Sequence, residues 1–168
     1  VGSEMCIRDR QLSTIQVDFA QPDNFDLQFV DNNNKRVKPV MIHRALLGSI
    51  ERFTGILIEN YAGEFPGWLS PVQVKVLTIG DVSNYLNKIT KSLKGFRYEV
   101  DDRNLRLGEK LHDASKDKIP ITLIVGEKDE LSNTLAINIR SQENQQNVKY
   151  EDAIKQIKAN LKTPIFKL

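Results

Sequence analysis

The sequence predicts an α/β protein: the end of an antiparallel sheet with one helix, followed by a βαβαββα unit with a mixed sheet. Three observations lead to this fold class. Strand-like runs occur at residues 15–19, 27–30 and 37–42, a proline- and glycine-rich break covers residues 65–71, and strands then alternate with amphipathic helices. The 168 residues are 40% hydrophobic and 27% charged, which excludes disordered and low-complexity classes.

The first ten residues show neither helical nor strand periodicity, and they hold the single cysteine, Cys6. We expect residues 1–10 to be a non-native or mistranslated leader and the fold to begin at Gln11. One cysteine forms no internal disulfide, which favours the cytoplasm. Every apolar run is far shorter than the roughly 20 residues that cross a bilayer, so we expect no membrane partner.

The segment after Gln11 predicts an antiparallel sheet. Apolar and polar residues alternate over 15–19, which indicates a half-buried strand, and the pattern breaks at residues 22–26. Two further strand-like runs, 27–30 and 37–42, flank a polar stretch typical of a turn.

A helix of about three turns follows these strands. Ser49 is suited to cap its amino end, and Gly63 lies near its expected stop. The apolar positions with helical spacing are Ile50, Phe53, Leu57 and Tyr61.

The two prolines and one glycine of residues 65–71 give the strongest boundary signal, which divides the chain into residues 11–70 and 71–168. The second domain is predicted to contain strands at 72–79, 96–100, 121–125 and 134–139, and helices at 83–93, 107–115 and around 154–161. Residues 1–71 hold 7 basic against 9 acidic side chains, and residues 72–168 hold 17 against 13. A solvated surface explains that mild basic bias as well as an RNA partner does.

Generic catalytic motifs are absent, and His43 and His112 are the only histidines. A zinc site needs three or four ligands, so no complete metal site can be derived from spacing. By itself, His43 is typical of a structural histidine.

Arg52 falls in the first turn of the helix that follows Ser49. A cation there faces free N–H groups and the positive end of the helix dipole, which is mildly unfavourable unless an anion such as phosphate is bound nearby. The alternative is an ion pair with Glu51 or Asp18.

Residues 39–53 read PVMIHRALLGSIERF, and this run resembles motif 3 of the class II threonyl-tRNA synthetases. Residues 11–19, QLSTIQVDF, are similar to a substrate-lining strand of that family, and residues 68–74, WLSPVQV, to its junction with the anticodon-binding domain. The synthetases for proline, glycine, serine and histidine share the strand, the helix and the arginine. They lack the histidine that corresponds to His43.

The resemblance implies a carboxy-terminal fragment of a threonine–tRNA ligase, an enzyme that uses ATP and Mg²⁺ to join threonine to threonine tRNA and binds Zn²⁺. It implies a homodimeric parent, and an inactive fragment because motifs 1 and 2 and the remaining zinc ligands would lie upstream. It assigns the catalytic, ATP-binding role to Arg52, further ATP contacts to Gln11 and Thr14, threonine binding to Gln16 and metal ligation to His43.

Residues 101–112, DDRNLRLGEKLH, and 126–129, GEKD, resemble anticodon-binding segments of the same family. The resemblance places Asn104, Lys118 and Asp129 at anticodon contacts, where splayed-out bases are read by hydrogen bonds. Three positions depart from the family pattern, namely Ser13, His112 and Asn138.

Two alternatives stay open. The anticodon-contact side chains are also compatible with an ordinary solvated surface. The whole chain is also compatible with a stand-alone RNA-binding or accessory module, but such a module has no use for the residues at positions 43 and 52.

Overall fold

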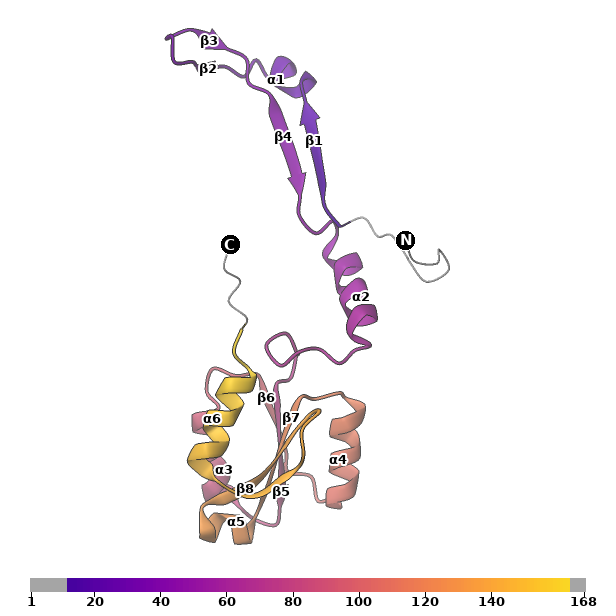
Figure 1. Cartoon of the computed structure of the whole chain (residues 1–168), viewed down its shortest axis with the longest axis vertical. Helices are drawn as coiled ribbons and strands as arrows, with labels where there is room; N and C mark the ends of the chain where they lie inside the picture. Colours follow the sequence, from indigo (N-terminus) through magenta and orange to yellow (C-terminus); the bar gives the residue numbers. More distant parts are fainter. Residues whose placement is uncertain (1–11, 164–168) are drawn as a thin grey trace. The chain divides into compact units, whose positions relative to one another are not determined.

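The computed structural model describes residues 12–163, so Gln11 and the expected leader lie outside the described residues (Figure 1). The chain divides into two compact units, and the boundary along the sequence falls between Glu59 and Asn60. Residues 65–71, expected to form the boundary, lie inside the second unit.

The first unit is built on an antiparallel ribbon in which β1 (Thr14–Asp18) pairs with β4 (Met41–Ala45). The other elements are α1 (Ala20–Asn24), β2 (Phe29–Val30), β3 (Arg36–Val37) and most of α2 (Ile50–Tyr61), whose last two residues lie past the boundary.

Two details of this unit differ from the prediction. The strand expected over 37–42 is divided between β3 and β4, with Pro39 between them, because a proline offers no N–H to a ladder. The break expected at residues 22–26 overlaps the short helix α1, which was not predicted because its sequence has no apolar periodicity. The helix α2 is confirmed, and its Arg52 N–H donates to Ser49 Oγ at 3.2 Å, as expected for an N-terminal cap.

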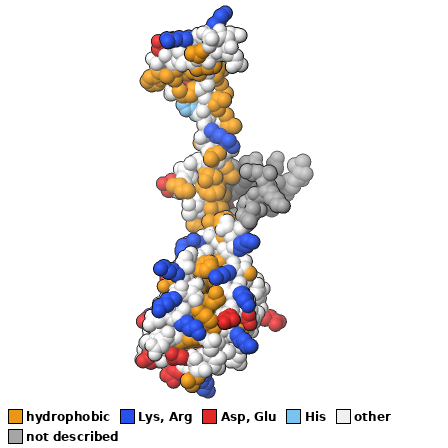
Figure 2. Space-filling view, turned by 90° about the vertical axis from the view of Figure 1, so that its left-hand side faces the viewer, with side chains coloured by type: hydrophobic (Ala, Val, Ile, Leu, Met, Phe, Trp, Pro, Cys, Tyr) orange, Lys and Arg blue, Asp and Glu red, His pale blue; other side chains and the backbone are white. Residues whose placement is uncertain are grey.

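The ribbon of the first unit leaves large apolar side chains in solvent (Figure 2). Ile15 is 65% exposed and Ile42 is 64% exposed, and within residues 12–59 Pro22 alone is buried. A two-stranded ribbon is at best marginally stable by itself. The described part of this unit therefore has no hydrophobic core of its own.

The second unit contains a five-stranded mixed sheet in the order β6-β5-β7-β8-β9. Its strands are β5 (Val74–Ile79), β6 (Tyr98–Asp101), β7 (Ile121–Gly126), β8 (Thr134–Ile139) and β9 (Gln145–Lys149). The pairs β5–β6 and β5–β7 are parallel, whereas β7–β8 and β8–β9 are antiparallel. The expected mixed sheet is confirmed.

Helices cover both faces of this sheet. Figure 1 shows α3 (Ser83–Ser92) and α6 (Tyr150–Asn160) on one side and α4 (Leu107–Lys116) on the other. Apolar side chains of α3 and α6, including Ile89 and Ile157, pack with the strands in one cluster whose central residues are fully buried. The second unit therefore contains the hydrophobic core that the first unit lacks.

Two elements of the second unit were not predicted, α5 (Glu127–Ser132) and β9. The residues of α5 are mostly acidic or polar and show no apolar period. Strand β9 reads QQNVK, and Val148 is its single partly buried residue. Hydrophobic periodicity cannot detect elements that contribute so little to a core.

Side chains of the second unit explain why residues 65–71 belong to it. Arg97 donates from Nε to the Ser70 carbonyl at 3.0 Å and from Nη2 to the Trp68 carbonyl at 2.9 Å. Gln73 donates from Nε2 to the Gly67 carbonyl at 2.8 Å. Prolines and glycines mark a change of chain direction, but these hydrogen bonds decide which unit holds the segment.

Within residues 12–163, no helix is both long enough and apolar enough to cross a bilayer.

Candidate functional site

The register of the ribbon gathers four polar residues on one face. Gln16 lies opposite His43, and Thr14 lies opposite Ala45. Because side chains alternate along a strand, Thr14, Gln16, Asp18 and His43 share this face, while Ile15 and Ile42 share the other. The structure thus brings together Thr14, Gln16 and His43, to which the resemblance gave ATP, threonine and metal contacts. Arg52 lies on α2, and Gln11 lies outside the described residues.

Asp18 holds the ring of His43. The Nε2 of His43 lies 3.2 Å from Asp18 Oδ2, while Asp18 Oδ1 accepts the Ala20 and Gln21 N–H groups at 2.9 and 3.0 Å. The Gln21 N–H foremost, with His43 and Ala20, lowers the pKa of the Asp18 carboxyl below its usual value. An ionised carboxylate at this place favours a proton on Nε2 and leaves Nδ1 free for another partner.

The described residues alone do not make a zinc site. No cluster of three or more His, Cys, Asp or Glu side chains with metal-binding geometry occurs within residues 12–163. Zinc needs three or four ligands, of which His43 would supply one.

Arg52 lies in the first turn of α2 and is exposed. Its guanidinium forms no ion pair with Glu51, Asp18 or any other acidic side chain of residues 12–163, and Asp18 is already engaged by His43 and α1. Neither ion pair considered from the sequence is formed. The guanidinium is therefore open to an anion near the amino end of the helix.

In the second unit, Asn104 and Asp129 lie at the same edge of the sheet. Asn104 follows β6 and Asp129 follows β7, and both strands run parallel to β5 between them. Ligands of open α/β sheets commonly bind at this carboxyl edge. A hollow of about 500 Å³ opens there beside Asn104, lined chiefly by residues 78–83 and 102–105, with Leu86 and Lys110.

The residues before Asn104 are fixed by an ion-pair network. Arg103 donates from Nε to Asp101 Oδ1 at 2.8 Å and from Nη2 to Asp101 Oδ2 at 2.6 Å, and Nη2 also reaches Asp113 Oδ2 at 2.7 Å. Hydrogen bonds from Arg103 lower the pKa of the Asp101 carboxyl to about 2. Bidentate pairing restricts the loop geometry immediately before Asn104.

Lys110 lines the hollow and links the ends of two strands by hydrogen bonds. Its side chain is 2% exposed, and Nζ donates to the Thr78 carbonyl at 2.8 Å and to the Asp101 carbonyl at 3.1 Å. These contacts join the carboxyl ends of β5 and β6. A buried ammonium is tolerated because carbonyl oxygens replace its lost water.

The two candidates at this edge differ in how far their side chains are already engaged. Asn104 is exposed, and its amide makes no hydrogen bond with the described part of the chain. Asp129 Oδ2 accepts the Gly126 N–H at 2.9 Å, and Oδ1 lies 3.4 Å from Thr134 Oγ1. Asp129 thus stabilises the start of α5, whereas Asn104 is free to bind a ligand.

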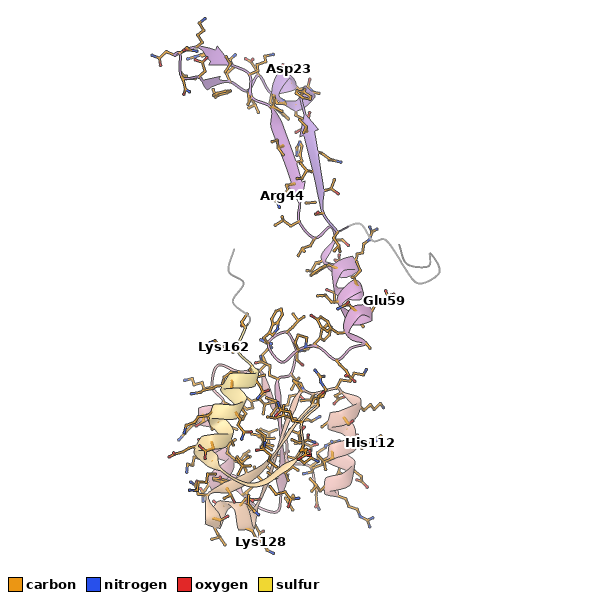
Figure 3. The ribbon with its side chains drawn as sticks, in the orientation of Figure 1. Asp23, Arg44, Glu59, His112, Lys128 and Lys162 are labelled. Atoms are coloured by element: carbon orange, nitrogen blue, oxygen red, sulfur yellow. The ribbon has the colours of Figure 1, made fainter. Side chains whose placement is uncertain are left out.

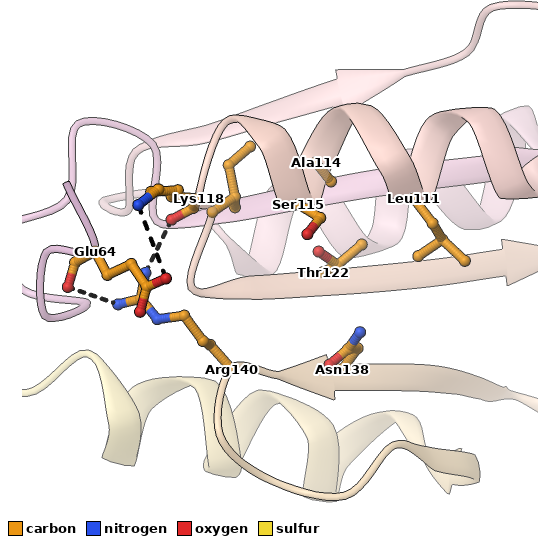
Figure 4. A pocket seen from close by; sticks show the side chains of 9 residues that line it. Glu64, Leu111, Ala114, Ser115, Lys118, Thr122, Asn138 and Arg140 are labelled. Carbon is orange, nitrogen blue, oxygen red and sulfur yellow. Dashed lines mark hydrogen bonds and ion pairs between the residues drawn. The ribbon is translucent and has the colours of Figure 1, made fainter. Parts of the chain in front are cut away.

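Lys118 lies at the opposite edge, where β7 begins and β8 ends (Figure 4). Its Nζ donates to the Ala62 carbonyl and lies 3.9 Å from Glu64 Oε1. Arg140 donates to the Lys118 carbonyl at 3.0 Å, to the Glu64 carbonyl at 3.2 Å and to the Phe65 carbonyl. Lys118 and Arg140 therefore tie residues 62–65 to the sheet.

The structure does not bring Lys118 together with Asn104 and Asp129. Lys118 instead borders a pocket of about 250 Å³ that also contains Asn138, while His112 lies on α4 (Figure 3). Sequence reasoning missed Arg140, because nothing in a lone arginine at a strand end indicates that it binds a segment some 75 positions earlier.

Comparisons with known proteins agree with this arrangement. Residues 73–160 match the family model described as "Anticodon binding domain", and residues 1–61 match "tRNA synthetase class II core domain (G, H, P, S and T)".

Curated relatives match along both units. The threonine–tRNA ligase of Clostridium tetani is 48% identical over 141 residues, covering 82% of this chain and 22% of the relative. The threonine–tRNA ligase of Aquifex aeolicus is 45% identical over 155 residues, which cover 90% of this chain and 24% of the relative. The chain thus spans about a quarter of the length of these relatives.

A solved structure is also similar. The RNA-binding domain of threonyl-tRNA synthetase from Cryptosporidium parvum superposes with a TM-score of 0.79 at 28% identity, covering 91% of this chain and 40% of that one.

The ionised Asp101 carboxylate makes the free energy of unfolding of the second unit fall at low pH. Because Asp101 has a folded pKa of about 2 against an ordinary 3.8, its contribution is complete above pH 4 and is lost as pH falls towards 2. We expect Asp101→Asn to lower the free energy of unfolding at pH 7 by about 1 to 3 kcal/mol and to flatten its decline below pH 4. Urea unfolding across this pH range measures both effects, with the exposed neighbour Asp102→Asn as control. Parallel pH profiles for Asp101→Asn and the unmodified chain would contradict this role.

Proposed function

The chain belongs to the anticodon-binding domain family and carries class II synthetase core sequence ahead of that domain, and from this premise we propose that it is part of a threonine–tRNA ligase. One observation carries the proposal: the identity to threonine–tRNA ligases extends through both units. The Gln16–His43 face of the ribbon supports it. The activity, ATP, Mg²⁺, threonine and threonine tRNA are proposed for the longer protein.

In this proposal, the first unit supplies part of the activation site. Arg52 binds ATP phosphate, supported by its unpaired guanidinium beside the amino end of α2. Thr14 and Gln16 line the adenylate and threonine sites, and His43 supplies one Zn²⁺ ligand. The resemblance also gives Gln11, outside the described residues, an ATP contact. A ribbon with an exposed apolar face suits a piece of a larger core better than a stand-alone module.

The second unit would read the anticodon. The exposed Asn104 amide, on a loop fixed by the Arg103–Asp101 pair, is suited to hydrogen-bond a splayed-out base edge. Asp129 shares this edge of the sheet, and Lys118 would contribute charge at the opposite edge. Homodimerisation of the ligase and its cytoplasmic location stay predictions.

Replacing Arg52 tests the ATP role. In a full-length ligase that contains this segment, Arg52→Ala should lower threonine-dependent pyrophosphate exchange by about 10² to 10³, because one phosphate-binding charge is lost. Arg52→Lys should restore only part, since lysine lacks the planar fork. Arg36→Ala, in the β2–β3 hairpin, is the control. Near-normal exchange by the Ala variant would remove Arg52 from the ATP site.

The zinc role of His43 is tested through its partner. Asp18→Asn in the same ligase should weaken zinc binding by about 10- to 100-fold, because the imidazole loses the carboxylate that orients it. His43→Ala should lower both zinc content and threonine affinity. Zinc content by metal analysis, and its loss to a graded chelator, measure these changes, with Asp23→Asn as control. Unchanged zinc in the His43→Ala protein would make His43 a structural histidine.

Base reading by Asn104 tests the function of the second unit. The chain should bind a threonine-tRNA anticodon stem-loop more tightly than loops with substituted anticodons. Asn104→Ala should reduce this preference by about 1 to 3 kcal/mol, because a base-edge hydrogen bond is lost. Fluorescence anisotropy with each loop measures the preference, and Asn87→Ala on α3 is the control. Equal affinity of the unmodified chain for all loops would favour the stand-alone alternative.

A further inference from the structure

Helices α3 and α6 contribute an unbalanced set of positive charges. Residues 82–98 contain Lys88, Lys91, Lys94 and Arg97 without an acidic residue, and residues 153–163 contain three lysines without one. Four of these lysines lie at or beyond the carboxyl ends of the two helices. We call them the α3–α6 basic face: Lys91, Lys94, Lys158 and Lys162.

The tertiary structure brings these four lysines to one end of the sheet. The C-cap residues of the two helices, Leu93 and Leu161, are buried and belong to the same core cluster. The chain after α3 meets the start of β5, where the Gln73 N–H donates to the Arg97 carbonyl at 2.7 Å, and Leu161 lies beside Ile121 at the start of β7. Figure 2 shows Lys and Arg side chains over the upper and middle parts of this side of the unit, whereas its lower part carries both acidic and basic side chains.

The four lysines are exposed, and none forms an ion pair with residues 12–163. Neighbouring lysines are engaged. Lys155 pairs with Asp152 at 3.3 Å, and Lys88 donates to Asn133 at 2.7 Å and lies 4.6 Å from the centre of the Tyr150 ring. The helix dipoles favour cations in the last turns, which accounts for Lys91 and Lys158. Lys94 and Lys162 lie beyond the helices, where this effect fades.

The side chains near the α3–α6 basic face indicate which kind of partner it can bind. The large apolar side chains that the second unit exposes within the described residues are Ile79, Tyr98, Leu105 and Leu131, and none belongs to α3 or α6. Within the described residues, the helices α3 and α6 therefore offer no large exposed apolar side chain as an anchor for a bilayer. Lysines are flexible point charges that bind phosphates without reading bases, and regularly spaced phosphates can engage several at once.

We propose that the α3–α6 basic face binds the sugar–phosphate backbone of RNA, independently of base sequence. It is separate from the Asn104 hollow, which lies at the opposite, carboxyl edge of the parallel strands. The proposal goes beyond the anticodon contacts suggested above and does not depend on them.

A loop-free RNA duplex is the direct probe. Fluorescence anisotropy of a labelled, blunt-ended duplex with the full 168-residue chain should show salt-dependent binding. Changing Lys91, Lys94, Lys158 and Lys162 together to Gln should weaken binding at least tenfold at low salt. It should also lower the slope of log affinity against log salt by roughly three, because about one counterion is released per phosphate contact.

The control variant removes the same charge elsewhere, by changing Lys35, Lys38, Lys116 and Lys128 to Gln. Figure 3 places Lys128 and Lys162 at opposite ends of the second unit. This variant should keep nearly all duplex binding, and circular dichroism should show that both variants are folded. An equal loss in both variants would overturn the proposal in favour of net charge, and absence of duplex binding by the unmodified chain would also overturn it.

Vesicle binding and the Asn104→Ala variant distinguish this face from a membrane-binding surface and from the anticodon site. Phosphatidylserine vesicles should bind weakly, and strong vesicle binding that requires the same four lysines would overturn the proposal in favour of a membrane. Asn104→Ala should leave duplex binding unchanged. Duplex binding without anticodon preference would contradict the anticodon role alone. Anticodon preference together with duplex binding that does not depend on these four lysines would contradict this face alone.

Discussion

The second unit depends on the burial of β5. From Val74 to Thr78 this strand is buried, and it pairs with parallel neighbours on both sides. A strand in that position must be apolar or must satisfy its polar groups internally. Both occur, since Thr78 Oγ1 donates to the Asp101 carbonyl at 3.3 Å and Lys75 pairs with Asp117 at 3.2 Å.

Because β5 is buried and paired on both sides, side chains that bind its ends also position the neighbouring loops. At its carboxyl end, Lys110 joins β5 to β6, and the Asp101–Arg103 pair presents Asn104 to solvent. At the other end, Lys118 and Arg140 bind the incoming segment. The Lys118 side chain is engaged by residues 62–64, whereas the Asn104 side chain is exposed, although the resemblance treats both residues as anticodon contacts.

The first unit follows a different rule, because register rather than burial organises it. An antiparallel pairing places every second residue on one face, so the Gln16–His43 pairing separates a polar face from an apolar one. The polar face has an internal contact between Asp18 and His43. The apolar face is exposed within the described residues, which is consistent with one part of a larger catalytic core.

Periodicity along the sequence determined the elements that carry a repeat of apolar residues, namely β1, α2, β5, α3, β7, β8 and α6. The resemblance in residues 39–53 also indicated His43 and Arg52. Only the tertiary structure decided that Asp18 holds His43, that Arg140 binds residues 64 and 65, and that lysines of α3 and α6 meet at one end of the sheet. Each of these arrangements places a polar side chain beside a group far away in the chain, and a polar residue on a surface has no periodic signature that identifies its neighbour.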